Sequence, residues 1–306
     1  MNRTTKSYIV LALKGMAMGA ADVVPGVSGG TIAFISGIYE ELLQSISNIN
    51  LSLFKTLKKE GFSAAWKQLN GNFLLALFSG IFISVVSLAK LISWLLETEP
   101  ILVWSFFFGL VLASVIYVGR QIKKWNIIAV ILVVLAAILA YYITTLPPLI
   151  SESSSNLFLF LAGAIAICAM ILPGISGSFI LVLLGAYKPI LQAVSDRDFV
   201  TIVIVGLGTI VGLLSFSRVL KWLFANYKNY TLAALTGFII GSLNKIWPWK
   251  KVLTYRTNSH GEQEPFNELS ISPFSYDGDP QLLYAILLSI IGFSIIIVLE
   301  KLAVKK

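Results

Sequence analysis

The chain has 306 residues, of which 57% are hydrophobic and 12% charged, and its mean hydropathy is +0.85. Soluble domains carry about twice that charged fraction, so the composition excludes a soluble protein and predicts one all-α, polytopic membrane domain over 1–306. The net charge of +8 comes without a basic block interleaved with aromatics, so we expect no nucleic-acid partner. The single cysteine, Cys168, and the single histidine, His260, exclude an internal disulfide and a histidine metal cluster, and we expect no metal and no cofactor.

The first apolar stretch is interrupted early. Segments 8–24 and 26–46 are separated by the sequence Pro25-Gly26-Val27-Ser28-Gly29-Gly30. Pro and Gly break helices, and a broken helix is tolerated at membrane depth only where protein packs around it or where it lines a wet cavity. We therefore predict a helical hairpin over 8–46 with the break at its tip. Sequence leaves open whether this hairpin is re-entrant or crosses the membrane fully.

An insertion and three spans follow the hairpin. The insertion, 47–71, is expected to form an amphipathic cytoplasmic helix on anionic lipid, with a plain connector as the alternative. Its apolar face would comprise Phe54, Leu57, Phe62, Trp66 and Leu69, with four lysines around them. Long apolar runs then predict membrane-spanning helices at 72–96, 101–118 and 126–146.

The second half of the chain repeats the first. Nine of the 22 positions from Pro25 to Ile46 are identical to those 148 residues later, where Pro173 begins a second Pro-Gly-x-Ser-Gly sequence. Beyond the insertion the offset is 128 residues. The repeat predicts a duplicated fold with halves 8–146 and 157–303. The second half would contain a hairpin at 157–187, spans at 199–224, 231–247 and 281–300, and an extracytoplasmic loop at 248–280.

Basic loops indicate the orientation. Lys and Arg gather in the N-terminal tail, the insertion, loop 119–125 and the C-terminal tail, whereas loops 97–100 and 147–156 carry only acidic charge. If each hairpin returns to its own side, these basic segments and both termini are cytoplasmic. Three crossings then separate the halves, and three is odd, so we predict inverted-topology repeats. Loop 248–280 is the exception, because it mixes three basic residues with several acidic ones.

Each Pro-Gly tip is a candidate anion site. A helix that begins at Ser28 or Ser176 presents free backbone N–H groups and a positive dipole end, and Ser is a favourable N-cap. Glycines let a ligand approach the backbone, which suits phosphate. Inverted repeats with broken helices place such sites between the repeats. The alternative is a tight helix–helix turn with glycines for close packing.

Charged residues near the membrane segments are further candidates. Lys90 and Arg218 occupy equivalent repeat positions inside predicted spans, where a cation is a functional candidate unless it snorkels to the headgroups. Asp22 precedes the first tip and is a candidate for coupling to a proton or sodium ion, or else a simple cap or ion pair. Glu40 and Glu41 are expected near the cytoplasmic exit of the first hairpin, with coupling or a surface role as alternatives.

The sequence "ADVVPGVSGGTIAFISGIYEEL", with its degenerate copy "LPGISGSFILVLLGAY", resembles the bacterial polyprenyl-phosphate transporter family over nearly the whole chain. From the repeats themselves we expect a rocking motion that alternates access to the two sides. The resemblance implies return of undecaprenyl phosphate from the outer to the inner leaflet of the cytoplasmic membrane. That movement recycles the carrier for cell-envelope polymers such as peptidoglycan. The phosphate-binding residues it implies are Pro25, Gly26, Ser28, Gly29, Gly30 and Thr31, then Pro173, Gly174, Ser176, Gly177 and Ser178. From their equivalent repeat positions, we expect Lys90 and Arg218 to receive and release the headgroup on opposite sides.

Two other functions are weighed against lipid transport. A transporter or channel for a small soluble anion shares every feature except an opening toward the lipid. A lipid phosphatase would need a histidine nucleophile or a carboxylate–metal cluster, and the lone His260 and the lack of clustered carboxylates in the spans argue against an enzyme. The oligomeric state is not predicted.

Overall fold

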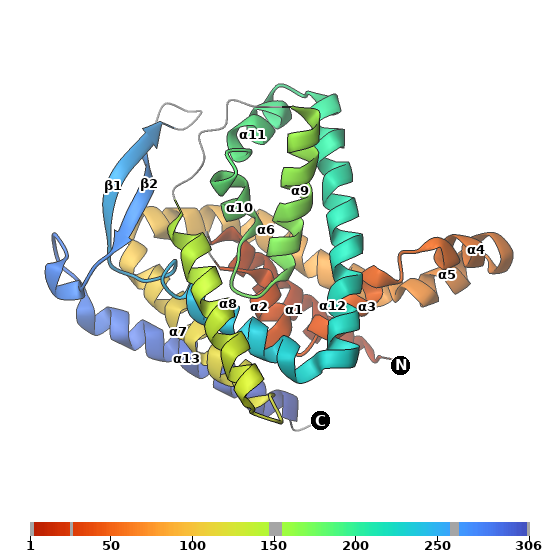
Figure 1. Cartoon of the computed structure of the whole chain (residues 1–306), viewed down its shortest axis with the longest axis horizontal. Coiled ribbons are helices and arrows are strands. Elements are labelled where there is room, and N and C mark those ends of the chain that lie inside the picture. Colours follow the sequence, from red (N-terminus) through yellow and green to blue (C-terminus); the bar gives the residue numbers. More distant parts are fainter. Residues whose placement is uncertain (1–2, 25–26, 147–154, 258–262, 305–306) are drawn as a thin grey trace.

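The computed structural model describes residues 3–24, 27–146, 155–257 and 263–304, and these are mostly helical. The helices form one bundle, from which a helical hairpin and a β-hairpin project (Figure 1). In chain order the elements are α1 (Thr5–Val23), α2 (Gly29–Ile35), α3 (Tyr39–Ser47), α4 (Leu51–Glu60), α5 (Phe62–Leu69), α6 (Gly71–Thr98), α7 (Pro100–Arg120), α8 (Ile127–Thr145), α9 (Asn156–Ile171), α10 (Gly177–Leu183), α11 (Tyr187–Ser195), α12 (Phe199–Ser242), β1 (Lys250–Thr257), β2 (Gln263–Ser270), the 3-10 helix η1 (Pro273–Ser275) and α13 (Leu282–Val304).

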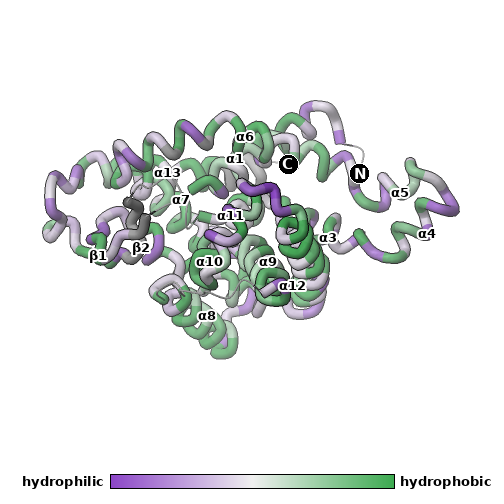
Figure 2. Tube along the Cα trace, turned by 90° about the horizontal axis from the view of Figure 1, so that it is seen from above, coloured by the Kyte–Doolittle hydropathy of each residue, from purple (hydrophilic) through white to green (hydrophobic). Residues whose placement is uncertain are grey.

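The surface of the bundle is built for lipid. In the described ranges, α6, α7, α8 and α12 are long and apolar enough to cross a membrane, and α10 with α11 adds a pair bent by 106°. Large apolar side chains such as Leu135 and Ile138 of α8 are 58% and 61% exposed. Most of the trace of α8 has the colour of hydrophobic residues (Figure 2). Exposed apolar surface on this scale is unfavourable in water, so the chain is a multi-pass membrane protein.

Most predicted helices lie where the sequence placed them, but α12 joins two predicted spans. It runs through 199–242 and bends at Tyr227, whose backbone angles (φ −133°, ψ 40°) leave the helical region. The ribbon turns sharply at this point (Figure 1). The parts before and after the bend correspond to the spans expected at 199–224 and 231–247.

The insertion differs from the prediction of one amphipathic helix. It forms two helices, α4 and α5, which pack against each other. Gly61 separates them with φ 83°, a conformation that glycine adopts without strain and that ends a helix. Of the five residues of the expected apolar face, Phe54, Leu57 and Phe62 are exposed, at 58%, 43% and 69%, while Trp66 and Leu69 are partly buried.

The all-helical prediction is wrong in the loop 248–280. Strands β1 and β2 pair there as an antiparallel hairpin. The run Val252–Tyr255 is rich in β-branched and aromatic residues, which favour extended backbone. Two tryptophans fix the hairpin to the bundle, because Trp247 Nε1 donates to the Ile271 carbonyl at 2.8 Å and Trp249 Nε1 donates to the Pro280 carbonyl at 2.9 Å.

The second helical hairpin is longer than predicted, because α11 continues it from 187 to Ser195. Its bend repeats that of the first hairpin. Gly37 (φ 72°) lies between α2 and α3, and Gly185 (φ 73°) lies between α10 and α11, 148 residues later. The N–H groups of the residues after these glycines, Ile38 and Ala186, donate to the equivalent carbonyls of Ala33 and Leu181.

The long helices of the two halves also pack at equivalent positions. Helix α1 crosses α6, and α9 crosses the first part of α12, in each case at reciprocal glycines that leave no room for a side chain. A Cβ added at any of them would lie within 3.0 Å of a facing backbone oxygen. These pairs are Gly15 with Leu77, Gly80 with Ala12, Gly163 with Val205 and Gly208 with Phe160, the last two being the first two shifted by 148 and 128 residues.

The last long helix of each half packs against the other half. Helix α13 packs on α7 of the first half, and α8 packs on the later part of α12 in the second half. Equivalent glycines make both contacts close, since Gly109 faces the Ser289 carbonyl and Gly237 faces the Val133 carbonyl. The exchange ties the halves into one unit and brings their Pro-Gly tips to a shared centre.

Candidate functional site

The two tips lie in the middle of the fold and are buried. The first tip (residues 27–31) joins α1 to α2, and the second tip (residues 172–178) joins α9 to α10. Ser28 and Thr31 are each 1% exposed, and Ser176 is 6% exposed. Two predicted site residues, Pro25 and Gly26, lie outside the described residues.

The tips bond to each other across the boundary between the halves. Ser28 Oγ lies 3.1 Å from the Met170 carbonyl oxygen and 3.3 Å from that of Leu172. In return, the Gly174 N–H donates to Thr31 Oγ1 at 3.0 Å. The positive N-terminal end of α2 therefore meets the negative C-terminal end of α9, which is a favourable dipole arrangement.

A phenol and a glycine close the same interface. Tyr39, fully inside the core, donates its O–H to the Ile171 carbonyl at 3.1 Å. Gly30 packs so tightly that a Cβ there would lie 2.6 Å from the Ile171 oxygen. The predicted motif residues Ser28, Gly30 and Thr31 thus form a tip-to-tip seam in this conformation.

The backbone donors of the first tip are already occupied. Asp22 Oδ1 accepts the Gly29 N–H at 2.7 Å, and Ser28 Oγ accepts the Gly30 N–H at 3.1 Å. A Cβ at Gly29 would lie 2.8 Å from the Asp22 carboxyl carbon, so the absence of a side chain at Gly29 leaves the space that the carboxylate occupies. Asp22 acts as an internal anion at a position where the sequence predicts phosphate.

The second tip differs from the first in its side-chain chemistry. Met170 stands where Asp22 stands in the first half, and its Cβ would be 3.1 Å from a Cβ at Gly177. Ser176 makes no capping hydrogen bond, and its Oγ lies 2.9 Å from Ser178 Oγ. Gly174 has φ 88°, which favours glycine. No carboxylate caps α10 among the described residues.

The two predicted cations form no hydrogen bond or ion pair with either tip in the described chain. Lys90 is exposed on α6. Arg218 Nη2 donates to the Ile49 carbonyl at 2.9 Å, just before the insertion. Both residues lie on surfaces, consistent with either of the roles considered for them from the sequence.

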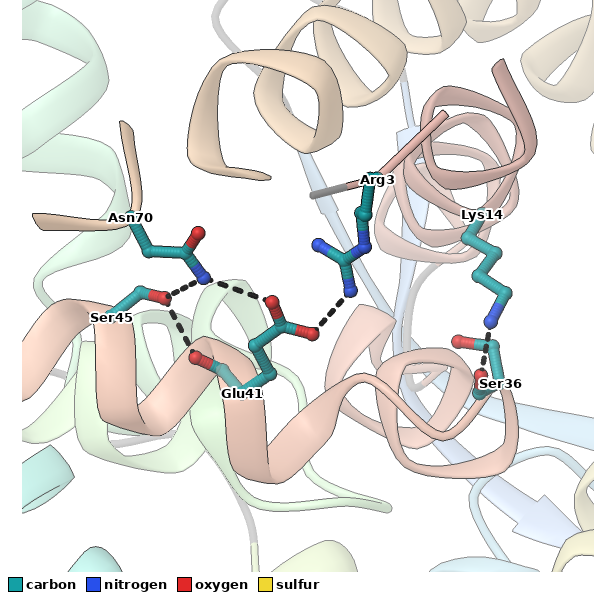
Figure 3. Close-up of polar contacts among 6 residues, drawn as sticks. All are labelled: Arg3, Lys14, Ser36, Glu41, Ser45 and Asn70. Atoms are coloured by element: carbon teal, nitrogen blue, oxygen red, sulfur yellow. Dashed lines mark hydrogen bonds and ion pairs between the residues drawn. The ribbon is translucent and has the colours of Figure 1, made fainter. Parts of the chain in front are cut away.

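Glu40 and Glu41 make ion pairs beside the insertion. Glu41 pairs with Arg3 at 2.5 Å and accepts a hydrogen bond from Asn70 at 2.9 Å. Figure 3 shows these residues together, with Lys14 nearby donating to the Ser36 carbonyl at the end of α2. Glu40 pairs with Lys228 near the bend of α12, at 2.6 Å.

Sequence reasoning missed a second charged cluster, formed by Lys245, Lys250 and Glu268. Lys245 Nζ lies 4.9 Å from the centre of the Phe179 ring, next to Ser178 of the second tip. Lys250 Nζ lies 4.3 Å from the centre of the Trp104 ring and 3.4 Å from Glu268. The available signal was the run Lys-Ile-Trp-Pro-Trp-Lys at 245–250, two lysines flanking a tryptophan pair.

Both lysines of this cluster are perturbed by their surroundings. Burial lowers the pKa of Lys250 to about 8 and also lowers the pKa of Lys245, while the nearby Glu268 carboxylate opposes both shifts. The cluster thus places two lysine side chains beside one carboxylate.

Known proteins are similar to this chain in sequence. The undecaprenyl phosphate translocase-like family matches residues 18–264. A Vibrio cholerae protein named "Polyprenyl-phosphate transporter" is 51% identical over 305 residues, covering 98% of this chain and 99% of its own length. A Staphylococcus aureus protein of the same name is 32% identical over 253 residues, covering 77% of this chain and 85% of its own. No solved structure matches. The chain belongs to the undecaprenyl phosphate translocase-like family.

Proposed function

We propose that the chain carries polyprenyl phosphate, most simply undecaprenyl phosphate, from the outer to the inner leaflet of the bacterial cytoplasmic membrane. The carrier would then be reused for cell-envelope polymers. Family membership and the names of the two relatives support a lipid-carrier transporter. The observation on which the proposal rests is the seam where the first and second tips bond across the two halves.

The seam is suited to act as a gate. A small number of hydrogen bonds, chiefly through Ser28 and Thr31, joins the two tips, while the halves also pack together through the exchanged helices α8 and α13. Rocking the halves apart on one side would break these bonds and uncover the N-terminal ends of α2 and α10. A phosphate could then accept the N–H groups that the protein now satisfies itself.

Asp22 is the residue at which lipid transport would be coupled to a proton or a sodium ion. A phosphate arriving at the Gly29 N–H would compete with the Asp22 carboxylate, because like charges cannot share one donor at low dielectric. The displaced carboxylate would take up a proton or a sodium ion. Phosphate binding and ion uptake would thereby be linked at the first tip.

Inverted repeats would allow the same motion to open the seam to either leaflet. In the orientation that the basic loops predict, both termini and the α4–α5 hairpin would face the cytoplasm, and the β-hairpin would face outward. The exposed apolar and basic side chains of α4 and α5 fit a cytoplasmic leaflet that is rich in anionic lipid.

Leaflet-resolved movement of fluorescent undecaprenyl phosphate in proteoliposomes tests the proposal. We expect protein-dependent movement that falls by about tenfold or more when Ser28→Ala and Thr31→Val are combined, since two buried cross-tip bonds are lost. Ser87→Ala is the matched control, because Ser87 is exposed on α6 and bonds its own helix.

Two results would contradict the proposal. Absence of lipid movement, with and without proton or sodium gradients, combined with phosphate flux into liposomes that lack polyprenyl phosphate, would establish a soluble-anion transporter. Unchanged lipid movement in the double variant would retain the transport function but exclude the seam as its gate.

A further inference from the structure

A charged cluster that the tip-to-tip seam does not use lies beside the second tip. Lys245 follows the end of α12, and Lys250 begins β1 and faces Glu268 of β2. The Lys250 side chain is only 9% exposed. Lys245 forms no ion pair among the described residues and rests on the Phe179 ring. Burying two ammonium groups with one carboxylate is costly, so the site gains from a bound anion.

The cluster adjoins an apolar slot. This cavity of about 310 Å³ lies between α7, α13 and the two tryptophans that follow Lys245. Its lining includes Phe108, Leu112, Trp247, Ile286, Ile290 and Phe293. Ile286 and Ile290 are 48% and 56% exposed on the membrane-facing side of α13, so the slot is reached from the lipid.

One face of α7 joins the cluster to the slot. Trp104, under the Lys250 ammonium, and Phe108, in the slot, are four residues apart and therefore neighbours on the helix. The Phe108 ring lies 5.3 Å from that of Trp247, which lies 5.4 Å from that of Trp249. The charged cluster and the apolar slot thus contact residues that lie about one helical turn apart on α7.

We propose that Lys245 and Lys250 hold the phosphate of a lipid phosphomonoester while the slot between α7 and α13 receives the first isoprenoid units of its tail. The argument for this occupant is charge complementarity at one end and an apolar, lipid-accessible cavity at the other. The assignment rests on the proposed function. With the β-hairpin outside, the cluster is the loading site from which the headgroup passes to the adjacent second tip.

The site has a characteristic pH dependence. Lys250 loses its proton as the pH rises through about 8, its pKa being lowered by burial and partly restored by Glu268, with Lys245 as the other facing charge. A phosphomonoester gains its second charge near pH ~6. Binding should therefore be tightest between these values, and should weaken above pH 8 as the lysine is neutralised.

Binding to the purified protein in nanodiscs tests the site without requiring transport. The probes are farnesyl phosphate, farnesol and inorganic phosphate, titrated by calorimetry against empty nanodiscs. We expect farnesyl phosphate to bind at least about tenfold more tightly than either fragment. The Lys245→Gln/Lys250→Gln variant should weaken farnesyl phosphate by about tenfold or more, as expected when charge-assisted contacts are lost.

Three variants control for folding, for the tail and for the charge. Lys251→Gln, at the exposed neighbour of Lys250, should bind like the wild type. Ile286→Trp, which fills the slot, should weaken farnesyl phosphate but leave inorganic phosphate unchanged. The Lys250→Arg variant retains the positive charge and should bind farnesyl phosphate far more tightly than the Lys245→Gln/Lys250→Gln variant. That difference would show that the double variant loses binding because it loses charge, not because it misfolds.

The failure of this site and the failure of transport are distinguishable. Wild-type binding that survives the double Gln substitution, in protein with an unchanged unfolding midpoint, overturns the site whatever transport shows. Inorganic phosphate that binds as tightly as farnesyl phosphate overturns the lipid assignment. Binding lost in the variants, in a protein that moves no lipid in liposomes, supports the site and removes the translocase proposal.

Discussion

The first and second tips differ in the groups that accept hydrogen bonds from the helix that follows each of them. At the first tip, Asp22 and Ser28 accept the N–H groups at the start of α2. At the second, Met170 stands in place of Asp22, and Ser176 caps nothing. The bends that follow, at Gly37 and Gly185, are nearly identical.

The difference suggests a division of labour after duplication. The first tip supplies the side chains that close the seam and carries the single acid. The second tip supplies backbone carbonyls and one N–H to that seam, and has the Lys245 ammonium beside it. If the tips bind the phosphate as proposed, the two halves of the duplicated fold would contribute different groups to it.

The largest effect is expected from wedging the tips apart. Gly30→Ala would place a Cβ 2.6 Å from the Ile171 oxygen and 3.1 Å from that of Met170, both rigid backbone atoms. Overpacking of this kind should lower the free energy of unfolding by ~2–3 kcal/mol. Thermal unfolding in detergent, followed by circular dichroism, measures the loss.

Gly206→Ala is the matched control. Gly206 has no atom within 4 Å of its added Cβ, and Ala is a better helix former by about 1 kcal/mol. We expect this variant to be neutral or slightly stabilised. Equal destabilisation by both substitutions would show that the seam is not the tightly packed contact described above.

A smaller effect is expected from removing the acid that distinguishes the tips. Asp22→Ala leaves the Gly29 N–H without its acceptor and should destabilise the protein by ~1–2 kcal/mol. Asp22→Asn retains an acceptor oxygen and should cost less. If Asp22 also couples transport to an ion, both variants should lose the dependence of transport on an ion gradient, whereas Met170→Ala should not.

Sequence predicted the long helices and the duplication because these follow from composition and repeated letters. An apolar run of about 20 residues leaves few alternatives in a membrane, and identical letters at a constant offset indicate equivalent structure in the two halves. The α4–α5 break was missed, since a single Gly61 in an amphipathic run is compatible with a continuous helix until its φ is known.

The chemistry of the tips was harder to predict because it depends on contacts between distant residues. Ser28 and Thr31 were identified as phosphate ligands, but their partners lie more than 140 residues away in the second tip. Lys245 lies at the end of the span predicted at 231–247, and Lys250 lies in the predicted loop 248–280. Their burial follows from the β-hairpin, which was not foreseen.

The smallest effect is expected at Glu40, where the two hairpins differ most in charge. The Glu40–Lys228 pair is more than half exposed on both sides, so Glu40→Gln should change stability by less than about 0.5 kcal/mol. The equivalent residue in the second hairpin is Lys188, of opposite charge, so an acid here is not part of the duplicated machinery. Lipid movement in Glu40→Gln proteoliposomes should stay within about threefold of the wild type. A loss as large as that expected for the Ser28/Thr31 variant would instead place an ion-coupling acid at the mouth of the first hairpin, away from Asp22.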